Sequence, residues 1–172
     1  LALQNILSES DRSFSAMFDL TRAKTMDDVY RAVCDVRFMA LNFIYGNKDH
    51  IAWQVSGRYP MRKTGRGHFP VLGWTGEYDW DGYVDVKDHP YVPDPPDGFW
   101  GTANHRSIPP DQRLILSSTW YAPERFERIK EMINSDNQHT WETAVDMQND
   151  RYDPFVKKLQ RVLFESPLSS DI

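Results

Sequence analysis

The chain has a single cysteine, Cys34, and its histidines are not arranged like metal ligands. With one cysteine, no disulfide bond can form within the chain. The histidines, at positions 50, 68, 89, 105 and 139, have neither the i, i+4 spacing of zinc ligands nor a ligand-type spacing with the cysteine. Cys34 lies among valines in a helical pattern, so we interpret it as a small packed side chain rather than a nucleophile.

The chain also lacks an excess of basic residues and any long apolar run. It has 20 Lys and Arg against 25 Asp and Glu, which argues against nucleic acid as a partner because phosphate binding needs a basic face. No apolar stretch approaches the roughly 18 residues of a membrane span, so no membrane partner is expected. No signal peptide is visible either.

Familiar catalytic motifs are missing too. There is no Gly-x-Ser-x-Gly elbow and no phosphate-binding loop. The acidic segment that starts at Asp79 looks like a calcium-binding loop, but its glycine, Gly82, is at the fourth position instead of the sixth. Its twelfth position is Pro90, where glutamate is required. We therefore expect turn residues here and predict no metal ligands in this chain.

Helical periodicity is present at both ends of the chain. Residues 1–38 are predicted as a helical lead-in, in which Thr25 caps a helix that has acids in its first turn. Residues 111–166 are predicted as helices, with Pro123 in the first turn of one and Thr140 as the N-cap of another.

The middle of the chain has the composition of strands and loops. Residues 39–57 predict a β-hairpin, because a run rich in strand formers at 39–46 is followed, after a turn-like NKDH link, by alternating apolar and small or polar residues at 51–57. Residues 58–110 contain many prolines, which forbid a long helix, and many aromatics, which argue against disorder. We predict an ordered loop region with short strands, one of them at Phe99–Asn104. The whole chain, 1–172, is thus predicted as one α+β piece.

Two local patterns suggest chemistry, and each has a simpler interpretation. Asn104 is a good neutral donor for an oxyanion and His105 a candidate base, although an asparagine in a turn explains the same letters. Arg125 and Arg128 lie three apart on a predicted helix, where they could form a solvated group with Glu124 and Glu127.

The stretch from Gly46 to Val84 closely resembles the middle of the large chain of the penicillin acylase family. The ordered elements that carry the resemblance are G-x-x-P-x-R from Gly57, P-V-x-G from Pro70, D-W-x-G from Asp79, and Asp94-Pro95-x-x-Gly98 in place of N-P-x-x-G. Later, TANHR is similar to the family's T-A-N-N-x, ERFERI to its R-x-x-R-I helix start, and DMQND to its M-Q-x-D region. The resemblance covers about residues 15–165.

The resemblance implies a fold and an activity. Members are N-terminal nucleophile hydrolases with a four-layer αββα sandwich built from two chains, and they are made as one precursor that cuts itself. The new N-terminal residue attacks the substrate amide, with its own α-amine as base. The implied substrate is a small N-acyl amide. The implied partners are the small chain and the N-terminal part of the large chain, which supply the nucleophile.

The resemblance also assigns roles to residues. Asn104 matches the oxyanion donor, Arg125 the arginine that orients the site, and Leu41 an apolar residue that lines the acyl pocket. Leu41 is equally compatible with a simple core position. His105 and Arg106 depart from the family pattern, and His105 would either alter the pH dependence or face solvent.

No cofactor is implied in this segment, but the resemblance allows for calcium in the parent protein, with Asp111 in the region of one ligand. It also implies a periplasmic or extracellular location. Because the chain begins at Leu1, we expect an excised piece that is inactive alone. A rival interpretation is a binding module whose platform is formed by Trp74, Trp80 and Trp100. A third is an inactive relative that keeps the acylase fold.

Overall fold

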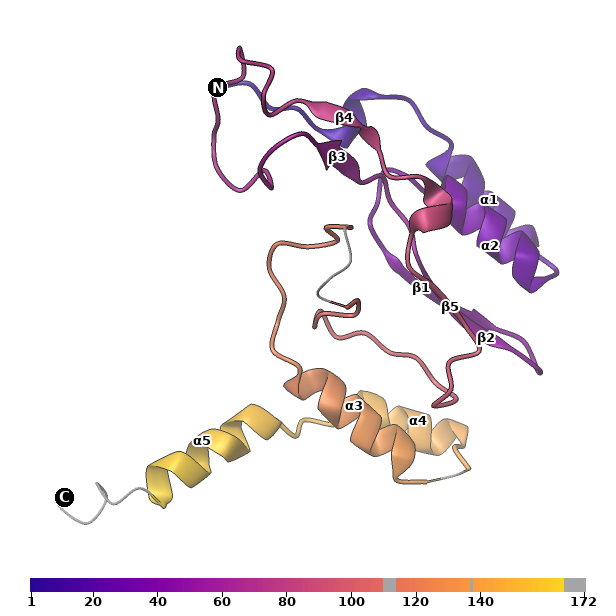
Figure 1. Ribbon diagram of the computed structural model, residues 1–172. Helices are drawn as coiled ribbons and strands as arrows, with labels where there is room; N and C mark the ends of the chain where they lie inside the picture. Colours follow the sequence, from indigo (N-terminus) through magenta and orange to yellow (C-terminus); the bar gives the residue numbers. More distant parts are fainter. Residues whose placement is uncertain (110–113, 137, 166–172) are drawn as a thin grey trace. The chain divides into compact units, whose positions relative to one another are not determined.

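The computed structural model describes residues 1–109, 114–136 and 138–165, and its helices and antiparallel strands give the predicted α+β fold (Figure 1). The chain divides into two compact units. The first unit contains Leu1–Trp100 and Ile108–Thr119, and the second contains Gly101–Ser107 and Trp120–Ile172. Within the described residues, every helix is too short or too polar to cross a lipid bilayer.

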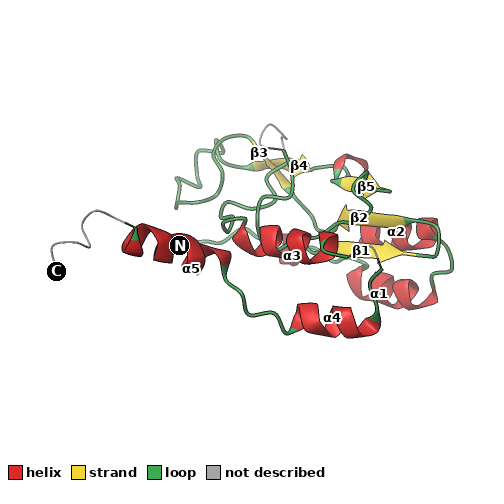
Figure 2. Ribbon diagram, turned by 90° about the horizontal axis from the view of Figure 1, so that it is seen from below, coloured by secondary structure: helices red, strands yellow, loops and turns green. Residues whose placement is uncertain are grey.

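The first unit begins with a short 3-10 helix, η1 (Ile6–Ser8), and two α-helices, α1 (Ser13–Arg22) and α2 (Met26–Asp35). The predicted cap of α2 is confirmed. Thr25 Oγ1 accepts the Asp28 N–H at 3.1 Å, and the Asp28 carboxylate accepts the Thr25 N–H at 2.9 Å. This capping box starts α2, which lies beside α1 and next to the sheet (Figures 1 and 2).

The main sheet of the first unit has three antiparallel strands in the order β1–β2–β5. The predicted hairpin is confirmed as β1 (Asn42–Gly46) and β2 (Ile51–Val55), and the third strand is β5 (Tyr91–Pro93). Residues 52–55 are all buried, because β2 is the central strand and α2 packs on it. On α2, the Cys34 sulfur accepts a hydrogen bond from Gln54 of β2 at 3.2 Å, and burial raises the pKa of this thiol.

The loop region contains a second, two-stranded sheet, β3 (Pro60–Arg62) and β4 (Trp80–Tyr83), and a short helix, η2 (Val86–Asp88). The predicted strand at Phe99–Asn104 is wrong, because the backbone is left-handed just before the segment and at its last residue. Gly98 has φ of 72° and Asn104 has φ of 61°, which an extended strand does not allow. Trp100 instead stacks on the buried Trp53, with ring centroids 4.8 Å apart.

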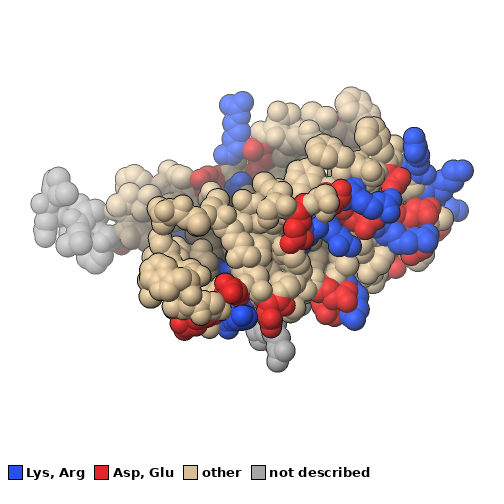
Figure 3. Space-filling model, turned by 90° about the horizontal axis from the view of Figure 1, so that it is seen from above, with Lys and Arg blue, Asp and Glu red and all other residues tan. Residues whose placement is uncertain are grey.

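The second unit contains three helices, α3 (Glu124–Asn134), α4 (Trp141–Gln148) and α5 (Pro154–Phe164). Pro123 directly precedes α3, where its missing N–H costs no hydrogen bond. Thr140 caps α4 as predicted, through a reciprocal pair of hydrogen bonds with Thr143. On the face shown in Figure 3, acidic and basic side chains lie interspersed.

Candidate active site

Asn104 lies in the loop 101–107 of the second unit, and its backbone conformation and hydrogen bonding fix its position there. Its φ of 61° lies in the left-handed region, which asparagine tolerates better than most residues. Its carbonyl oxygen accepts a hydrogen bond from the Tyr121 N–H at 2.9 Å. Tyr121 lies two residues before the N-cap of α3. The preceding residue, Ala103, is buried. The loop therefore presents an exposed Asn104 side chain from a fixed backbone.

Arg125, on the first turn of α3, contacts Asn104 directly. Its Nη2 donates to Asn104 Oδ1 at 2.6 Å and to the Ala103 carbonyl at 2.6 Å. The guanidinium also lies over the Tyr121 ring, 5.7 Å from the centroid. The interpretation of Arg125 and Arg128 as a solvated group with neighbouring glutamates is wrong, because neither arginine bonds to Glu124 or Glu127 in the described structure.

The Arg125 contact determines which way the Asn104 amide points. A guanidinium has only donors, so it must face the amide oxygen and not the amide nitrogen. The Nδ2 group is thereby turned away from Arg125, and it has no hydrogen-bond partner among the described residues. Two N–H donors backed by a nearby positive charge suit the binding of an oxygen that carries negative charge.

The His105 ring is half-buried, because one of its faces is covered. It stacks on Phe126 of α3, with centroids 4.1 Å apart and planes at 17°. Its Nδ1 lies 3.4 Å from the Ala103 N–H, which it accepts, so the ring proton belongs on Nε2. Burial lowers the pKa of His105. Gly101 also lies against Phe126, since a Cβ at Gly101 would be 3.6 Å from that ring.

A bidentate ion pair, which reasoning on the residues missed, lies one turn further along α3. Arg128 donates through Nε and Nη2 to the two Asp150 oxygens at 2.9 and 2.8 Å. Arg128 also reaches Glu131 at 3.1 Å and lies over the Tyr152 ring. The hydrogen bonds from Arg128 hold the pKa of Asp150 below its usual value. The pair joins the R-x-x-R-I and M-Q-x-D patterns, and these patterns were the only feature of the sequence that could have indicated it.

Leu41, the predicted pocket residue, belongs to the first unit and directly precedes β1. Its backbone is fixed on both sides by Ser56. The Leu41 N–H donates to Ser56 Oγ at 3.1 Å, and the Leu41 carbonyl accepts the Ser56 N–H at 3.0 Å. The side chain is exposed, at 39%. It is not a core residue here, and its role in an acyl pocket stays a prediction.

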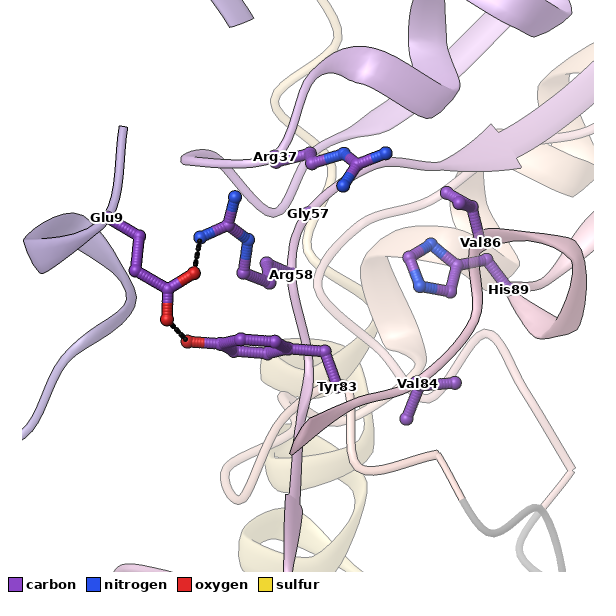
Figure 4. A pocket seen from close by; sticks show the side chains of 8 residues that line it. All are labelled: Glu9, Arg37, Gly57, Arg58, Tyr83, Val84, Val86 and His89. Atoms are coloured by element: carbon purple, nitrogen blue, oxygen red, sulfur yellow. Dashed lines mark hydrogen bonds and ion pairs between the residues drawn. The ribbon is translucent and has the colours of Figure 1, made fainter. Parts of the chain in front are cut away.

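The first unit also contains a cavity of about 130 Å³, shown in Figure 4. The Glu9 carboxylate bridges Arg58 and Tyr83, at 2.8 Å from each. The buried His89 ring also lines the cavity, and neither of its nitrogens has a hydrogen bond in the described structure. Burial lowers the pKa of His89, although backbone groups of Val55 and Val84 oppose the shift. None of the predicted site residues lines this cavity.

The rival interpretation as a binding module gains little from the structure. Trp74 is exposed, Trp80 lies against Tyr83 and under Arg62, and Trp100 stacks on Trp53. No two of these three predicted platform rings are in contact with each other in the described structure. The described residues also contain no cluster of three metal-binding side chains, and Asp111 lies outside them.

Comparison with known proteins decides the family. Residues 1–171 match the family model for penicillin amidase. The chain belongs to the penicillin amidase family. It is 45% identical over 167 residues to acyl-homoserine lactone acylase QuiP of Pseudomonas aeruginosa and 44% identical to the protein of that name in Pseudomonas putida. Each match covers 97% of this chain and 20% of the relative. The Penicillin acylase 2 proenzyme of Pseudomonas sp. (strain SE83) is 30% identical over 162 residues, covering 93% of this chain and 21% of the proenzyme.

The chain thus spans about a fifth of the length of the curated relatives that it matches. Its fold matches that of a thermostable penicillin G acylase from Alcaligenes faecalis, with a TM-score of 0.70 and 17% identity. This match covers 91% of the chain and 29% of the acylase. The predicted family and the predicted fold class are therefore both confirmed.

Proposed function

We propose that this chain is a segment of the large chain of an amide hydrolase, which cleaves the linear amide bond of N-acyl substrates. Membership of the penicillin amidase family supports this activity, since the relatives named above are acylases. One observation carries the assignment of the site. Arg125 donates to both Asn104 Oδ1 and the Ala103 carbonyl, which leaves the Asn104 Nδ2 donors available to a substrate.

In the proposed reaction, the N-terminal nucleophile of another part of the protein attacks the carbonyl carbon of the substrate amide. The α-amine of that residue takes the hydroxyl proton and passes it to the leaving amine. Negative charge develops on the substrate oxygen, and Asn104 Nδ2 donates to it. Water then cleaves the ester intermediate and releases the acyl group as a carboxylic acid.

Arg125 makes this donation effective because it fixes the amide before the reaction begins. An oxyanion donor contributes most when it needs no rearrangement as charge develops. The guanidinium holds Oδ1, and its positive charge favours negative charge on the far side of the amide. Arg125 is thus a positioning residue in this proposal, and Asn104 is the residue that touches the reacting atoms.

The names of the relatives reported above suggest the first substrate class to test. The QuiP proteins are named as acyl-homoserine lactone acylases, so we propose N-acyl homoserine lactones first and penicillin-type amides second. In this proposal Leu41 contacts the acyl chain. The segment alone is inactive, because the nucleophile comes from the rest of the acylase. The parent protein acts in the periplasm or outside the cell, with calcium as its candidate metal.

The test is the variant Asn104→Ala in the complete protein that contains this segment. Hydrolysis of an N-acyl homoserine lactone is measured through the release of the free amine. Loss of one oxyanion donor is expected to lower kcat by about 10²–10³-fold with little change in KM. Asn134→Ala is the matched control, because Asn134 is exposed at the end of the same helix that carries Arg125. Wild-type turnover by a correctly folded and processed Asn104→Ala protein would refute the proposal.

A further inference from the structure

His105 directly follows Asn104 and has no role in the reaction proposed above. It is nevertheless tied closely to the same structure. Its ring stacks on Phe126, the residue after Arg125, and its Nδ1 accepts the Ala103 N–H at 3.4 Å. The loop 101–107 and α3 are therefore joined at two adjacent points, by Arg125 and by the ring of Phe126.

Ala103 is the residue on which both attachments converge. Its carbonyl accepts from Arg125, and its N–H donates to His105. Ala103 is buried, so a peptide N–H that lost its acceptor here would not readily find water. The position of the Asn104 amide thus depends on a backbone that His105 and Arg125 hold from opposite ends of one residue.

The two contacts of His105 differ in their need for a neutral ring. Stacking on Phe126 is open to either protonation state. The Nδ1 bond requires a lone pair, which an imidazolium lacks, since both of its ring nitrogens donate. Protonation would place two N–H donors against each other at 3.4 Å. It would also add positive charge to a loop that already contacts Arg125.

We propose that His105 is a positioning residue whose neutral form keeps Asn104 in place as the oxyanion donor, so that the hydrolase loses activity when His105 takes up a proton. This inference rests on the function proposed above for Asn104. It explains the histidine at this position as more than a space-filling side chain. His105 itself does not touch the substrate.

The charged surroundings fit a ring that is neutral near pH 7. On its own loop the neighbouring charge is Arg106, which lies over Trp120, 5.9 Å from the ring centroid. On α3 the charges next to Phe126 are Arg125, Glu127 and, one turn on, Lys130. Burial is the cause of the lowered His105 pKa. The unfolded chain therefore binds the proton more readily, and the loop loses stability as pH falls below about 6.5.

The experiment measures kcat/KM from pH 5 to pH 8.5 for the complete protein and two variants. His105→Gln keeps a side-chain oxygen as acceptor but cannot titrate, and His105→Phe keeps a stacking ring without an acceptor. His68→Gln is the control, because His68 is exposed in the first unit. Melting temperatures at pH 8 check that each variant is folded.

In the wild type and in His68→Gln, we expect protonation of His105 to add about a tenfold loss of kcat/KM per pH unit below a midpoint under 6.5, beyond the loss from protonation of the α-amine base. In His105→Gln, activity at pH 8 stays within about threefold of the wild type, and this additional loss is absent. His105→Phe is less active at pH 8, and it too lacks the additional loss. Acid limbs that superimpose on the wild type in both variants would overturn the inference.

Failure of this inference can be told apart from failure of the proposed function. Full activity of Asn104→Ala at pH 8 would remove the proposed function, whatever the His105 variants do. Loss of activity in Asn104→Ala, together with an unchanged acid limb in both His105 variants, would remove only the role of His105.

Discussion

Replacing Arg125 by methionine removes the guanidinium that fixes the Asn104 amide. The methionine side chain retains most of the aliphatic volume of arginine but has no N–H to donate to Asn104 Oδ1 or to the Ala103 carbonyl. The two lost bonds are each 2.6 Å long and come from a charged donor. Without them, the Asn104 amide is free to turn its oxygen toward the substrate, where it would repel the developing charge.

The expected loss follows from the strength of one such bond. A hydrogen bond to a charged group contributes about 1.5–3 kcal/mol, which corresponds to roughly 10- to 150-fold in rate if the bond serves only to orient the donor. We therefore expect kcat of Arg125→Met to fall by that factor, with little change in KM. Arg125→Lys keeps the charge and should fall between Arg125→Met and the wild type, since an ammonium lacks the planar geometry of the guanidinium.

A double-mutant cycle with Asn104→Ala separates this role from general damage. If Arg125 acts through Asn104, its replacement has almost no further effect once the Asn104 amide is gone, and the double variant is about as slow as Asn104→Ala. The assay is the amine-release measurement at pH 8, with the melting temperature of each variant as a check on folding. Fully additive effects on kcat would refute the reasoning that links the two residues.

Three further predictions concern stability. Asp150→Ala leaves Arg128 without its bidentate partner, so the melting temperature should fall, whereas Glu131→Ala, which removes an exposed partner, should change it little. Because the pKa of Asp150 is lowered in the folded chain, its contribution to stability is present above the usual aspartate pKa of about 3.9 and is lost as pH falls below that value. Between pH 7 and pH 3, the melting temperature of Asp150→Ala should therefore fall less than that of the wild type. Thr25→Ala removes one half of the α2 capping box and should lower the free energy of unfolding by about 1 kcal/mol, measured by urea denaturation against the exposed control Thr64→Ala.

The parts of the fold that were predictable from sequence are those set by neighbouring residues. The hairpin follows from alternation within 51–55, and the starts of α2 and α4 follow from the caps Thr25 and Thr140. The pairing of β2 with β5 joins residues about forty apart, and no local pattern specifies it. The segment Phe99–Asn104 was wrongly predicted as a strand, because its Trp100 side chain stacks on Trp53 and its backbone does not pair with a neighbouring strand.

The site was predictable only in part, for a similar reason. From the residues alone, Asn104 was best explained as a turn and Arg125 as a solvated charge. The resemblance singled out both residues, and the structure brings them into contact across 21 positions of sequence. Neither the residues nor the resemblance indicated which atoms meet, although those atoms fix the direction of the amide. The stacking of His105 on Phe126 was also unpredictable, since it depends on how the loop folds onto α3.

The most direct test of the central claim is one distance in the complete protein. A phosphonate that mimics the tetrahedral intermediate of amide hydrolysis would be bound at the nucleophile, and the structure of the complex determined. The account predicts Asn104 Nδ2 about 2.7–3.1 Å from the phosphonate oxygen that represents the oxyanion, with Oδ1 still on Arg125. An oxyanion held by other donors, with the Asn104 amide out of hydrogen-bond range, would contradict it.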